Sequence, residues 1–139
     1  AGVEGLVITV LFACVHNAGR SQMAAALFNE LADAAKVRAI SAGTRPGPYV
    51  HPEVVGVMAE IGVDLADATP QLLTPELAAG ASWLITMGCG DECPFVPGAT
   101  RKDWPLPDPK GCPPEEVRRI RDDIRHRVIA LLNEHGWSR

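Results

Sequence analysis

The stretch LVITVLFACVHNAGRS, residues 6–21, joins an apolar run to a short polar loop that contains one cysteine and one arginine. Residues 6–13 are apolar and rich in β-branched side chains, which predicts a strand that is buried on both faces. A helix should follow from about residue 21 to residue 35, where Met23, Leu27 and Leu31 recur at four-residue steps. A buried strand that leads through a loop into a helix is typical of proteins built on a parallel sheet.

Further strand and helix patterns follow this first unit. The predicted strands are residues 37–41, 83–87 and 100–104, and the predicted helices are residues 52–61, a short segment from Thr74, and residues 114–132. Pro52 suits a first helical turn, and Gly62 suits a helix end. The alternation predicts an α/β fold in three layers, with a four-stranded parallel sheet and helices on both faces. Ligands bind beyond the carboxyl ends of such strands, where we expect Cys14 to lie.

The size and charge of the chain exclude several classes of protein. Its 139 residues suit a single domain, residues 1–139, with one core. The net charge of −4 shows no basic excess, so we expect no nucleic-acid partner. The longest apolar run, residues 6–15, is too short to cross a bilayer and lacks the features of a secretory signal. We therefore expect no membrane partner and a cytoplasmic monomer whose four cysteines start as thiols.

The loop from Cys14 to Ser21 predicts a site for a tetrahedral oxyanion. Five residues separate Cys14 from Arg20, enough for the backbone to curl so that its N–H groups converge on one anion. Asn17 and Gly19 tolerate the left-handed backbone of a tight curl, and Arg20 offers a planar fork to two oxygens. Ser21 can cap the helix and bond the sulfur, and the positive field favours the nucleophilic thiolate of Cys14. The alternative is a structural cysteine before an ordinary helix.

The predicted contacts of the oxyanion are the seven residues that follow the cysteine: Val15, His16, Asn17, Ala18, Gly19, Arg20 and Ser21.

A candidate acid lies between two prolines. Pro107 and Pro109 stiffen the loop that carries Asp108, and a carboxyl group there can protonate an oxygen expelled by nucleophilic attack. Asp103 is a competing carboxylate that we rank lower. The alternative is that Asp108 only forms a turn, as Asp beside Pro often does.

Cys89 and Cys93 form a candidate redox pair. They follow the predicted strand 83–87, so they should lie at the same sheet edge as Cys14. A spacing of four residues places two cysteines on one side of a helical turn, within reach of a disulfide after local adjustment. Gly88, with Gly90 and Pro94, favours an irregular loop. The alternatives are packing cysteines or half of a zinc site, but no second ligand pair accompanies them, so we predict no metal.

Five segments together resemble the arsenate reductases that are built on the low-molecular-weight tyrosine phosphatase fold. The segments are Cys14 to Ser21 with Gln22-Met23-Ala24, Ser41-Ala42-Gly43-Thr44, His51-Pro52-Glu53-Val54, Met87-Gly88-Cys89 with Cys93-Pro94, and Pro107-Asp108-Pro109. The cysteine–arginine loop and the Asp-Pro pair are shared with the phosphatases, whereas the paired cysteines are specific to the reductases.

The chain also departs from the patterns of both groups. Lys110 and Gly111 follow the Asp-Pro pair, where the phosphatases carry aromatic residues for a tyrosine ring, which argues against phosphotyrosine. Only three residues separate Cys89 from Cys93, fewer than in the better-known thioredoxin-coupled reductases. Ala25 stands where some of those reductases use a Glu to bind potassium, so we predict no potassium site.

The resemblance implies a three-cysteine reduction of arsenate, with phosphate or sulfate as competing oxyanions. Cys14 attacks arsenate held by Arg20 while Asp108 acts as the acid, Cys89 then attacks Cys14, and Cys93 attacks Cys89. The resulting Cys89–Cys93 disulfide should be more exposed than the Cys14–Cys89 disulfide that precedes it. We expect no bound cofactor and an external thiol reductant. That reductant is a thioredoxin-like protein or, alternatively, mycothiol with a redoxin.

Two other functions remain open. One is a low-molecular-weight phosphomonoesterase or tyrosine phosphatase that uses Cys14, Arg20 and Asp108, and weak activity of this kind is expected in any case. The other is a protein that binds an oxyanion without turnover and therefore has no need of Asp108.

Overall fold

Strand β1 (Ile8–Cys14) lies inside a sheet whose strands all run in the same direction. The computed structural model describes residues 7–89, 93 and 96–139. β1 pairs with β2 (Val37–Gly43) on one edge and with β3 (Trp83–Thr86) on the other, and β4 (Thr100–Asp103) pairs with β3. The order β2-β1-β3-β4 confirms the predicted four-stranded parallel sheet.

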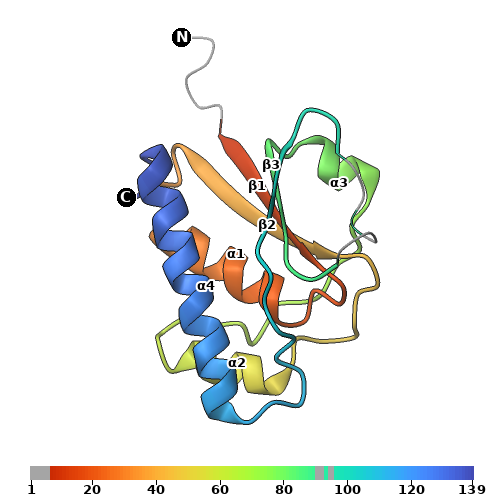
Figure 1. The fold of residues 1–139 in the computed structure, drawn as a ribbon, viewed down its shortest axis with the longest axis vertical. Coiled ribbons are helices and arrows are strands. Elements are labelled where there is room, and N and C mark those ends of the chain that lie inside the picture. The colour runs from red at the N-terminus through yellow and green to blue at the C-terminus, as the bar shows by residue number, and fades with distance from the viewer. Residues whose placement is uncertain (1–6, 90–92, 94–95) are drawn as a thin grey trace.

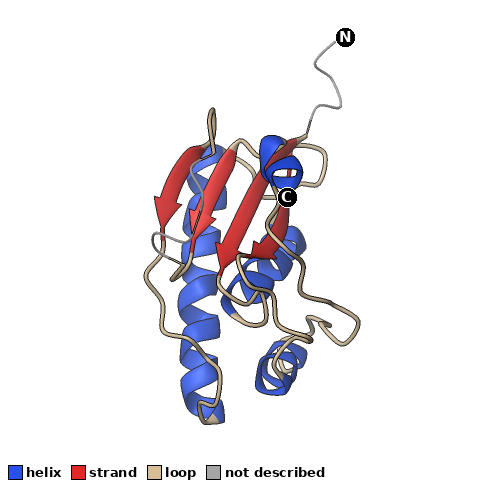
Figure 2. Ribbon diagram, turned by 90° about the vertical axis from the view of Figure 1, so that its right-hand side faces the viewer, coloured by secondary structure: helices blue, strands red, loops and turns tan. Residues whose placement is uncertain are grey.

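Helices cover both faces of this sheet, which confirms the predicted three layers. Helices α1 (Arg20–Leu31), α2 (Pro52–Ala59) and α4 (Pro114–His135) lie to one side in Figure 1, and the short α3 (Pro75–Ala79) lies to the other. Figure 2 shows the four strands of the sheet from another side, with helices packed along it.

The side chains of β1 alternate between two hydrophobic cores. Phe12 belongs to the larger core, which also contains Phe28 of α1 and Ile124 of α4. Leu11 belongs to the smaller core, which includes Ala78 of α3 and both Cys89 and Cys93. β1 is therefore buried on both faces, as its apolar run predicts.

The strand order places a topological switch point at the end of β1. The chain passes from β1 to β2 on one side and later returns to β3 on the other side of β1. The connections that leave the carboxyl ends of β1 and β3 therefore diverge, and such a switch point is where open α/β sheets bind ligands. Cys14 is the last residue of β1, so the predicted position of this residue is confirmed.

Several predicted element boundaries are wrong by a few residues. The first helix ends at Leu31 because Ala32 adopts an extended conformation and forms a β-bridge with Ser138. The last helix continues to His135, where Gly136 ends it with a left-handed backbone of φ 68°. The second strand extends to Gly43, and the second helix stops at Ala59.

The strand boundaries shift in the same way. The third and fourth strands each stop one residue before their predicted ends, at 86 and 103. β1 begins at residue 8, and residue 6 of its predicted range lies outside the described residues. Within the described part of the chain, no helix is both long and apolar enough to span a membrane.

A charged cluster joins α2 to α4. Arg118 donates to both carboxylate oxygens of Glu60, at 3.0 Å from Nε and 2.8 Å from Nη2. The buried Arg121 donates to the same carboxylate at 3.0 Å and to the carbonyl of Val57 at 2.8 Å. The hydrogen bond from Arg118 is the main reason that the pKa of Glu60 lies below its ordinary value of 4.5.

We predict that Glu60→Gln destabilises the protein at neutral pH but not in acid. The folded carboxyl group binds its proton less tightly than the unfolded one, so its stabilisation is present above the ordinary pKa and disappears as the pH falls through the lowered pKa. Urea unfolding midpoints at about pH 7 and pH 3 measure the effect. Glu30→Gln, at an exposed position of α1, is the control and should leave both midpoints unchanged. An equal loss for Glu60→Gln at both pH values would contradict the prediction.

Candidate active site

The loop between Cys14 and Arg20 is anchored through its carbonyl groups. The carbonyls of Cys14, Val15, His16 and Ala18 accept hydrogen bonds from N–H groups of residues 44, 45, 47 and 51, at distances between 2.8 and 3.2 Å. In a trans peptide, the N–H and the C=O of one unit point in opposite directions. Anchoring the carbonyls on the segment after β2 therefore turns N–H groups of the loop away from that segment. This orientation is required for an anion-binding nest, a concave stretch of backbone whose N–H groups converge on one anion.

Asn17 connects this loop to its surroundings. Its φ of 50° confirms the predicted left-handed backbone, and its side chain is fully buried. Its amide nitrogen donates to the hydroxyl of Ser21 at 2.8 Å, and its amide oxygen accepts from the backbone N–H of Gln71 at 2.9 Å. Gln22 donates to the same oxygen at 3.2 Å and to the carbonyl of Thr69, also at 3.2 Å. Sequence reasoning missed the supporting role of Gln22, although this residue directly follows the cysteine–arginine motif.

The prediction that Gly19 is needed for a left-handed backbone is wrong. Gly19 has a φ of −144° and is not left-handed. A Cβ atom at this position would lie 2.7 Å from Cγ of Pro109 and 3.4 Å from the ring of His51. A glycine is therefore needed because the loop packs closely against the segment that carries Asp108.

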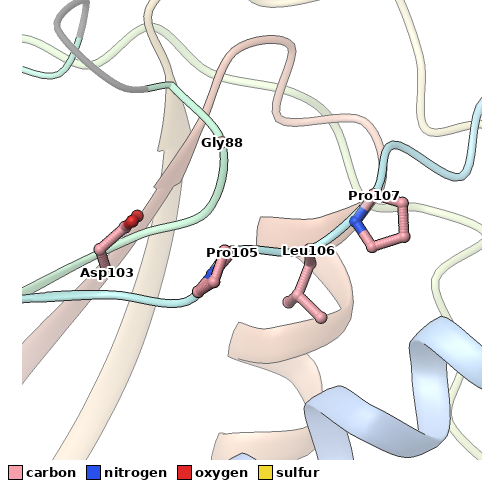
Figure 3. Close-up of a pocket in the computed structure, with 5 residues that line it drawn as sticks. All are labelled: Gly88, Asp103, Pro105, Leu106 and Pro107. Carbon is pink, nitrogen blue, oxygen red and sulfur yellow. The ribbon is translucent and has the colours of Figure 1, made fainter.

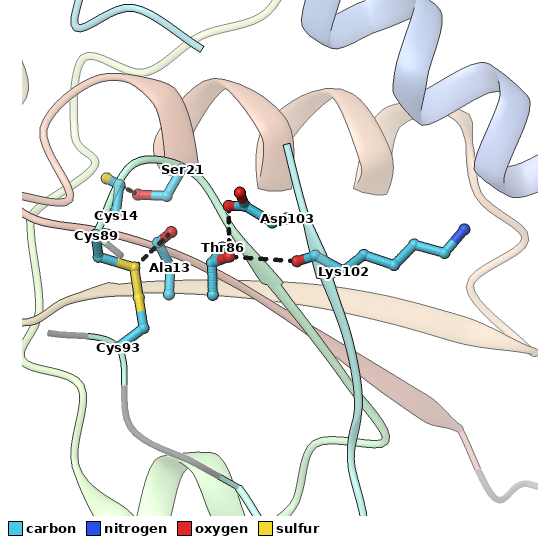
Figure 4. The surroundings of a disulfide bond; sticks show 8 residues. All are labelled: Ala13, Cys14, Ser21, Thr86, Cys89, Cys93, Lys102 and Asp103. Atoms are coloured by element: carbon cyan, nitrogen blue, oxygen red, sulfur yellow. Dashed lines mark hydrogen bonds between the residues drawn. A yellow bond between two sulfur atoms is a disulfide. The ribbon is translucent and has the colours of Figure 1, made fainter. Parts of the chain in front are cut away.

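The sulfur of Cys14 is hydrogen-bonded and almost fully buried. Its Sγ lies 2.8 Å from Oγ of Ser21 (Figure 4). Because this Oγ already accepts from Asn17, its own proton is free to be donated to the sulfur. The predicted helix-capping role of Ser21 is wrong, since α1 begins at Arg20 and its N-cap residue is Gly19, which has no side-chain bond.

Arg20 and Asp108 lie next to each other beside the loop. Nη1 of Arg20 donates to the carbonyl of Leu106 at 3.0 Å, and Nη2 lies 4.0 Å from Oδ2 of Asp108. Only 9% of the arginine side chain is exposed, against 45% of the Asp108 side chain. The tertiary structure therefore brings the predicted acid to the predicted anion-binding arginine. The competing carboxylate, Asp103, instead accepts a hydrogen bond from Thr86 at 2.8 Å.

A pocket of about 420 Å³ opens between two chain segments on this side of the arginine. Gly88, after β3, lines one side, and Leu106 and Pro107 line the other (Figure 3). Asp103 also faces this pocket. A second pocket of about 500 Å³ is lined by residues that include His16, Tyr49, His51 and Lys110.

Cys89 and Cys93 form a disulfide at the same edge of the sheet, as their spacing predicts (Figure 4). Their Cα atoms are 5.5 Å apart, and Sγ of Cys89 lies 3.7 Å from the carbonyl oxygen of Ala13, the residue before Cys14. The expectation that this disulfide is exposed is wrong, because both cysteines are only 4% exposed within the smaller core. The predicted helical turn between them, and the loop residues Gly90 and Pro94, lie outside the described residues.

The remaining histidine and cysteine near the loop have other partners. Nδ1 of His16 lies 3.1 Å from the carbonyl oxygen of Arg45, so this ring is bound away from the sulfur of Cys14. Cys112 is not part of a disulfide, and its Sγ lies 3.5 Å from the carbonyl oxygen of Asp108. Among the residues that the structure describes, no group of three or more His, Cys, Asp or Glu side chains is arranged to hold a metal ion.

Comparisons with known proteins agree with this fold. Residues 9–136 match the family model described as low molecular weight phosphotyrosine protein phosphatase. The chain is 40% identical over 129 residues to a Halobacterium salinarum protein that carries the provisional name of an arsenate reductase, with 88% of this chain and 89% of that protein covered.

Two solved structures are similar over nearly the whole chain. The thioredoxin-dependent arsenate reductase of Corynebacterium glutamicum is 41% identical with a TM-score of 0.80, over 92% of this chain but only 61% of that protein. An arsenate reductase in its oxidised state is 30% identical with a TM-score of 0.79, over 91% of this chain and 97% of that one.

We predict that Asn17→Ala destabilises the protein by about 2–4 kcal/mol, because it forces alanine into a left-handed backbone and leaves buried donors without an acceptor. Asn17→Gly is the matched control, since it removes the same hydrogen bonds but relieves the backbone, and should recover about 1 kcal/mol. Urea unfolding measures both variants. Equal stabilities of the two would show that the backbone conformation contributes nothing, and losses below about 0.5 kcal/mol would contradict the role of the hydrogen bonds.

Proposed function

The chain belongs to the low molecular weight phosphotyrosine protein phosphatase family, and we propose that within this family it reduces arsenate to arsenite. The observation that carries the proposal is the Cys89–Cys93 disulfide, whose nearer sulfur lies 3.7 Å from the carbonyl of the residue before Cys14. Hydrolysis of a phosphate ester through one thiolate needs no second thiol. Reduction of an oxyanion needs two electrons, which thiols supply when they become a disulfide.

The first step is attack by Cys14 on bound arsenate. The anion occupies the nest of loop residues 15–21, with Arg20 bonded to its oxygens. The thiolate forms a sulfur–arsenic bond, and Asp108 gives a proton to the departing oxygen, which leaves as water. The bond from Ser21 to the sulfur supports the thiolate, and the position of Asp108 beside Arg20 supports its role as the acid.

The second step moves electrons through three sulfurs. The Cys89 thiolate attacks the sulfur of Cys14, the sulfur–arsenic bond breaks, and its electron pair stays with arsenic, which leaves as arsenite. The Cys93 thiolate then attacks Cys89 and releases Cys14 as a thiolate. The described state, with a free Cys14 and a Cys89–Cys93 disulfide, corresponds to the end of this sequence.

An external thiol must then restore the two cysteines. We propose a dithiol protein of the thioredoxin type, because a protein disulfide is its usual substrate and because the similar Corynebacterium glutamicum enzyme is thioredoxin-dependent. The 4% exposure of both cysteines means that the reductant can attack only after this segment becomes more accessible. The starting thiols also require a reducing compartment, for which we propose the cytoplasm.

Phosphate-ester hydrolysis is the second candidate function. The loop with Cys14 and Arg20, and Asp108 beside it, would serve this reaction equally well, since phosphate and arsenate share shape and charge. Weak phosphatase activity beside the reductase activity therefore fits the proposal. Mycothiol with a redoxin is the alternative reductant, in which case the small thiol attacks the arsenic adduct on Cys14 and Cys93 is dispensable.

We predict that fully reduced protein converts one arsenate per chain without external thiol and ends with a Cys89–Cys93 disulfide. Arsenite release and disulfide mapping by mass spectrometry measure this single turnover. Cys89→Ser should abolish arsenite release but retain phosphatase activity, Cys93→Ser should stop at a Cys14–Cys89 disulfide, and Cys112→Ser is the control that changes nothing. Retained phosphatase activity with no arsenite from the native protein, even after mycothiol is added, would reject the reductase proposal. Arsenite that appears only with added mycothiol, or near-native steady turnover of Cys93→Ser, would favour the small-thiol alternative.

We predict that Asp108→Asn lowers kcat by about 100-fold or more, because general-acid catalysis typically contributes that much, with little change in KM. Asp103→Asn is the matched control, because this carboxylate bonds Thr86, and it should retain most of the activity. The test is steady-state arsenate reduction with a thioredoxin system. A larger loss of kcat in Asp103→Asn than in Asp108→Asn would show that Asp103, and not Asp108, acts as the acid.

A further inference from the structure

We propose that Gly88 is a positioning residue for Arg20, and that this contact couples oxyanion binding to reduction of the adjacent disulfide. Gly88 has a left-handed backbone with a φ of 94°. A Cβ atom here would lie 3.1 Å from Cζ of Arg20 and 3.6 Å from Nη2, and would collide with Nη1. The backbone after β3 therefore lies directly against the guanidinium group, and a side chain at position 88 would have to displace it.

The guanidinium group is confined between two chain segments. Its Nη1 donates to the carbonyl of Leu106 at 3.0 Å, while Gly88 lies against the same nitrogen. Figure 3 shows Gly88 and Leu106 on segments that face each other across the pocket of about 420 Å³. Nη2 is left near Asp108, on the side of the anion-binding loop. A side chain at position 88 would push the guanidinium away from Leu106, so that its N–H groups would no longer be oriented toward the oxyanion.

The same contact joins the arginine to the redox pair, because Gly88 is bonded directly to Cys89. Both cysteines are only 4% exposed, so the chain around the disulfide, which Gly88 adjoins, must shift before an external thiol can reach it. An oxyanion bound by Arg20 fixes the guanidinium group, and the fixed guanidinium in turn restrains Gly88. Bound oxyanion should therefore slow reduction of the disulfide, and by linkage any shift of Cys89 should alter the hold of Arg20 on the anion.

The inference rests on the proposed function only through oxyanion binding by Arg20 and the presence of the disulfide. Both can be measured without arsenate turnover, with inorganic phosphate as the probe. Failure of arsenate reduction and failure of this coupling are therefore separate results.

The first experiment compares Gly88→Ala with Gly98→Ala. Gly98 also has a left-handed backbone, with a φ of 84°, but a Cβ there meets no atom within 4 Å. The two substitutions therefore carry a similar backbone penalty, and urea unfolding should report similar losses of stability. Phosphate affinity, measured by calorimetry, should fall at least about tenfold in Gly88→Ala and stay near the native value in Gly98→Ala, because only Gly88→Ala displaces a charged hydrogen-bond donor. Equal phosphate affinities in the two variants would overturn the positioning role.

A double-mutant cycle with Arg20→Lys identifies the contact itself. Lysine lacks the Nη1 atom that a Cβ at position 88 would meet, so Gly88→Ala should weaken phosphate binding much less in the Arg20→Lys background. Equal effects of Gly88→Ala in both backgrounds would show that it acts through something other than the arginine.

The second experiment needs no variant for its main result. Oxidised native protein is treated with dithiothreitol in phosphate or in chloride of equal ionic strength, and the rate of thiol release is measured. Phosphate should slow the release severalfold in the native protein and in Gly98→Ala, but not in Gly88→Ala. An equal rate in phosphate and chloride for the native protein, at phosphate concentrations that saturate the site, would overturn the coupling.

Discussion

The hydrogen bonding of β1 along both of its edges is the interaction on which the rest of the structure depends. Cys14 pairs with Gly43 of β2, and Ala13 pairs with Thr86 of β3. These pairings continue past the strands, since the N–H of Met87 donates to the carbonyl of Ala13. The loop after β1 and the segment that carries Cys89 therefore start side by side. No local property of either segment could bring them together.

The site combines the loop after β1 with residues that follow the later strands of the sheet. The segment after β2 takes up the carbonyls of the loop, and the buried amide of Asn17 holds its left-handed turn. Arg20 leaves this loop as the first residue of α1 and is bonded to Leu106, which lies 86 residues further along the chain. The proposed roles in anion binding, proton transfer and thiol exchange thus fall on three segments that meet at the switch point of the sheet.

The burial of the redox pair means that the cysteines can react with each other inside the protein while external thiols cannot reach them directly. A disulfide inside the smaller core is shielded from chance reaction with thiols, whereas it must be reached by the partner that restores it. The phosphatase reaction makes no such demand. The contact between Gly88 and Arg20 gives a physical route by which an occupied anion site and a shielded disulfide influence each other.

The sequence by itself determined the parts of the protein that depend on short spacings. Apolar runs and helical periodicity identified the parallel sheet and its helices, and the placement of Pro52 and Thr74 located two helix starts. The spacing of Cys14 and Arg20 predicted an anion-binding loop, and that of Cys89 and Cys93 identified the pair that forms a disulfide. These features are local because backbone propensity and the reach of neighbouring side chains set them.

Only the tertiary structure decided what depends on contacts between distant residues. The first helix stops at Leu31 because the following residue pairs with Ser138, and Gly19 is required because Pro109 packs against it. The fold also brings Asp108, the carboxylate that the sequence ranked first, to Arg20, and it buries the disulfide that was expected to be exposed. Each outcome is set by chain segments tens of residues apart, and their packing is a property of the whole sheet and its covering layers that no short stretch of sequence contains.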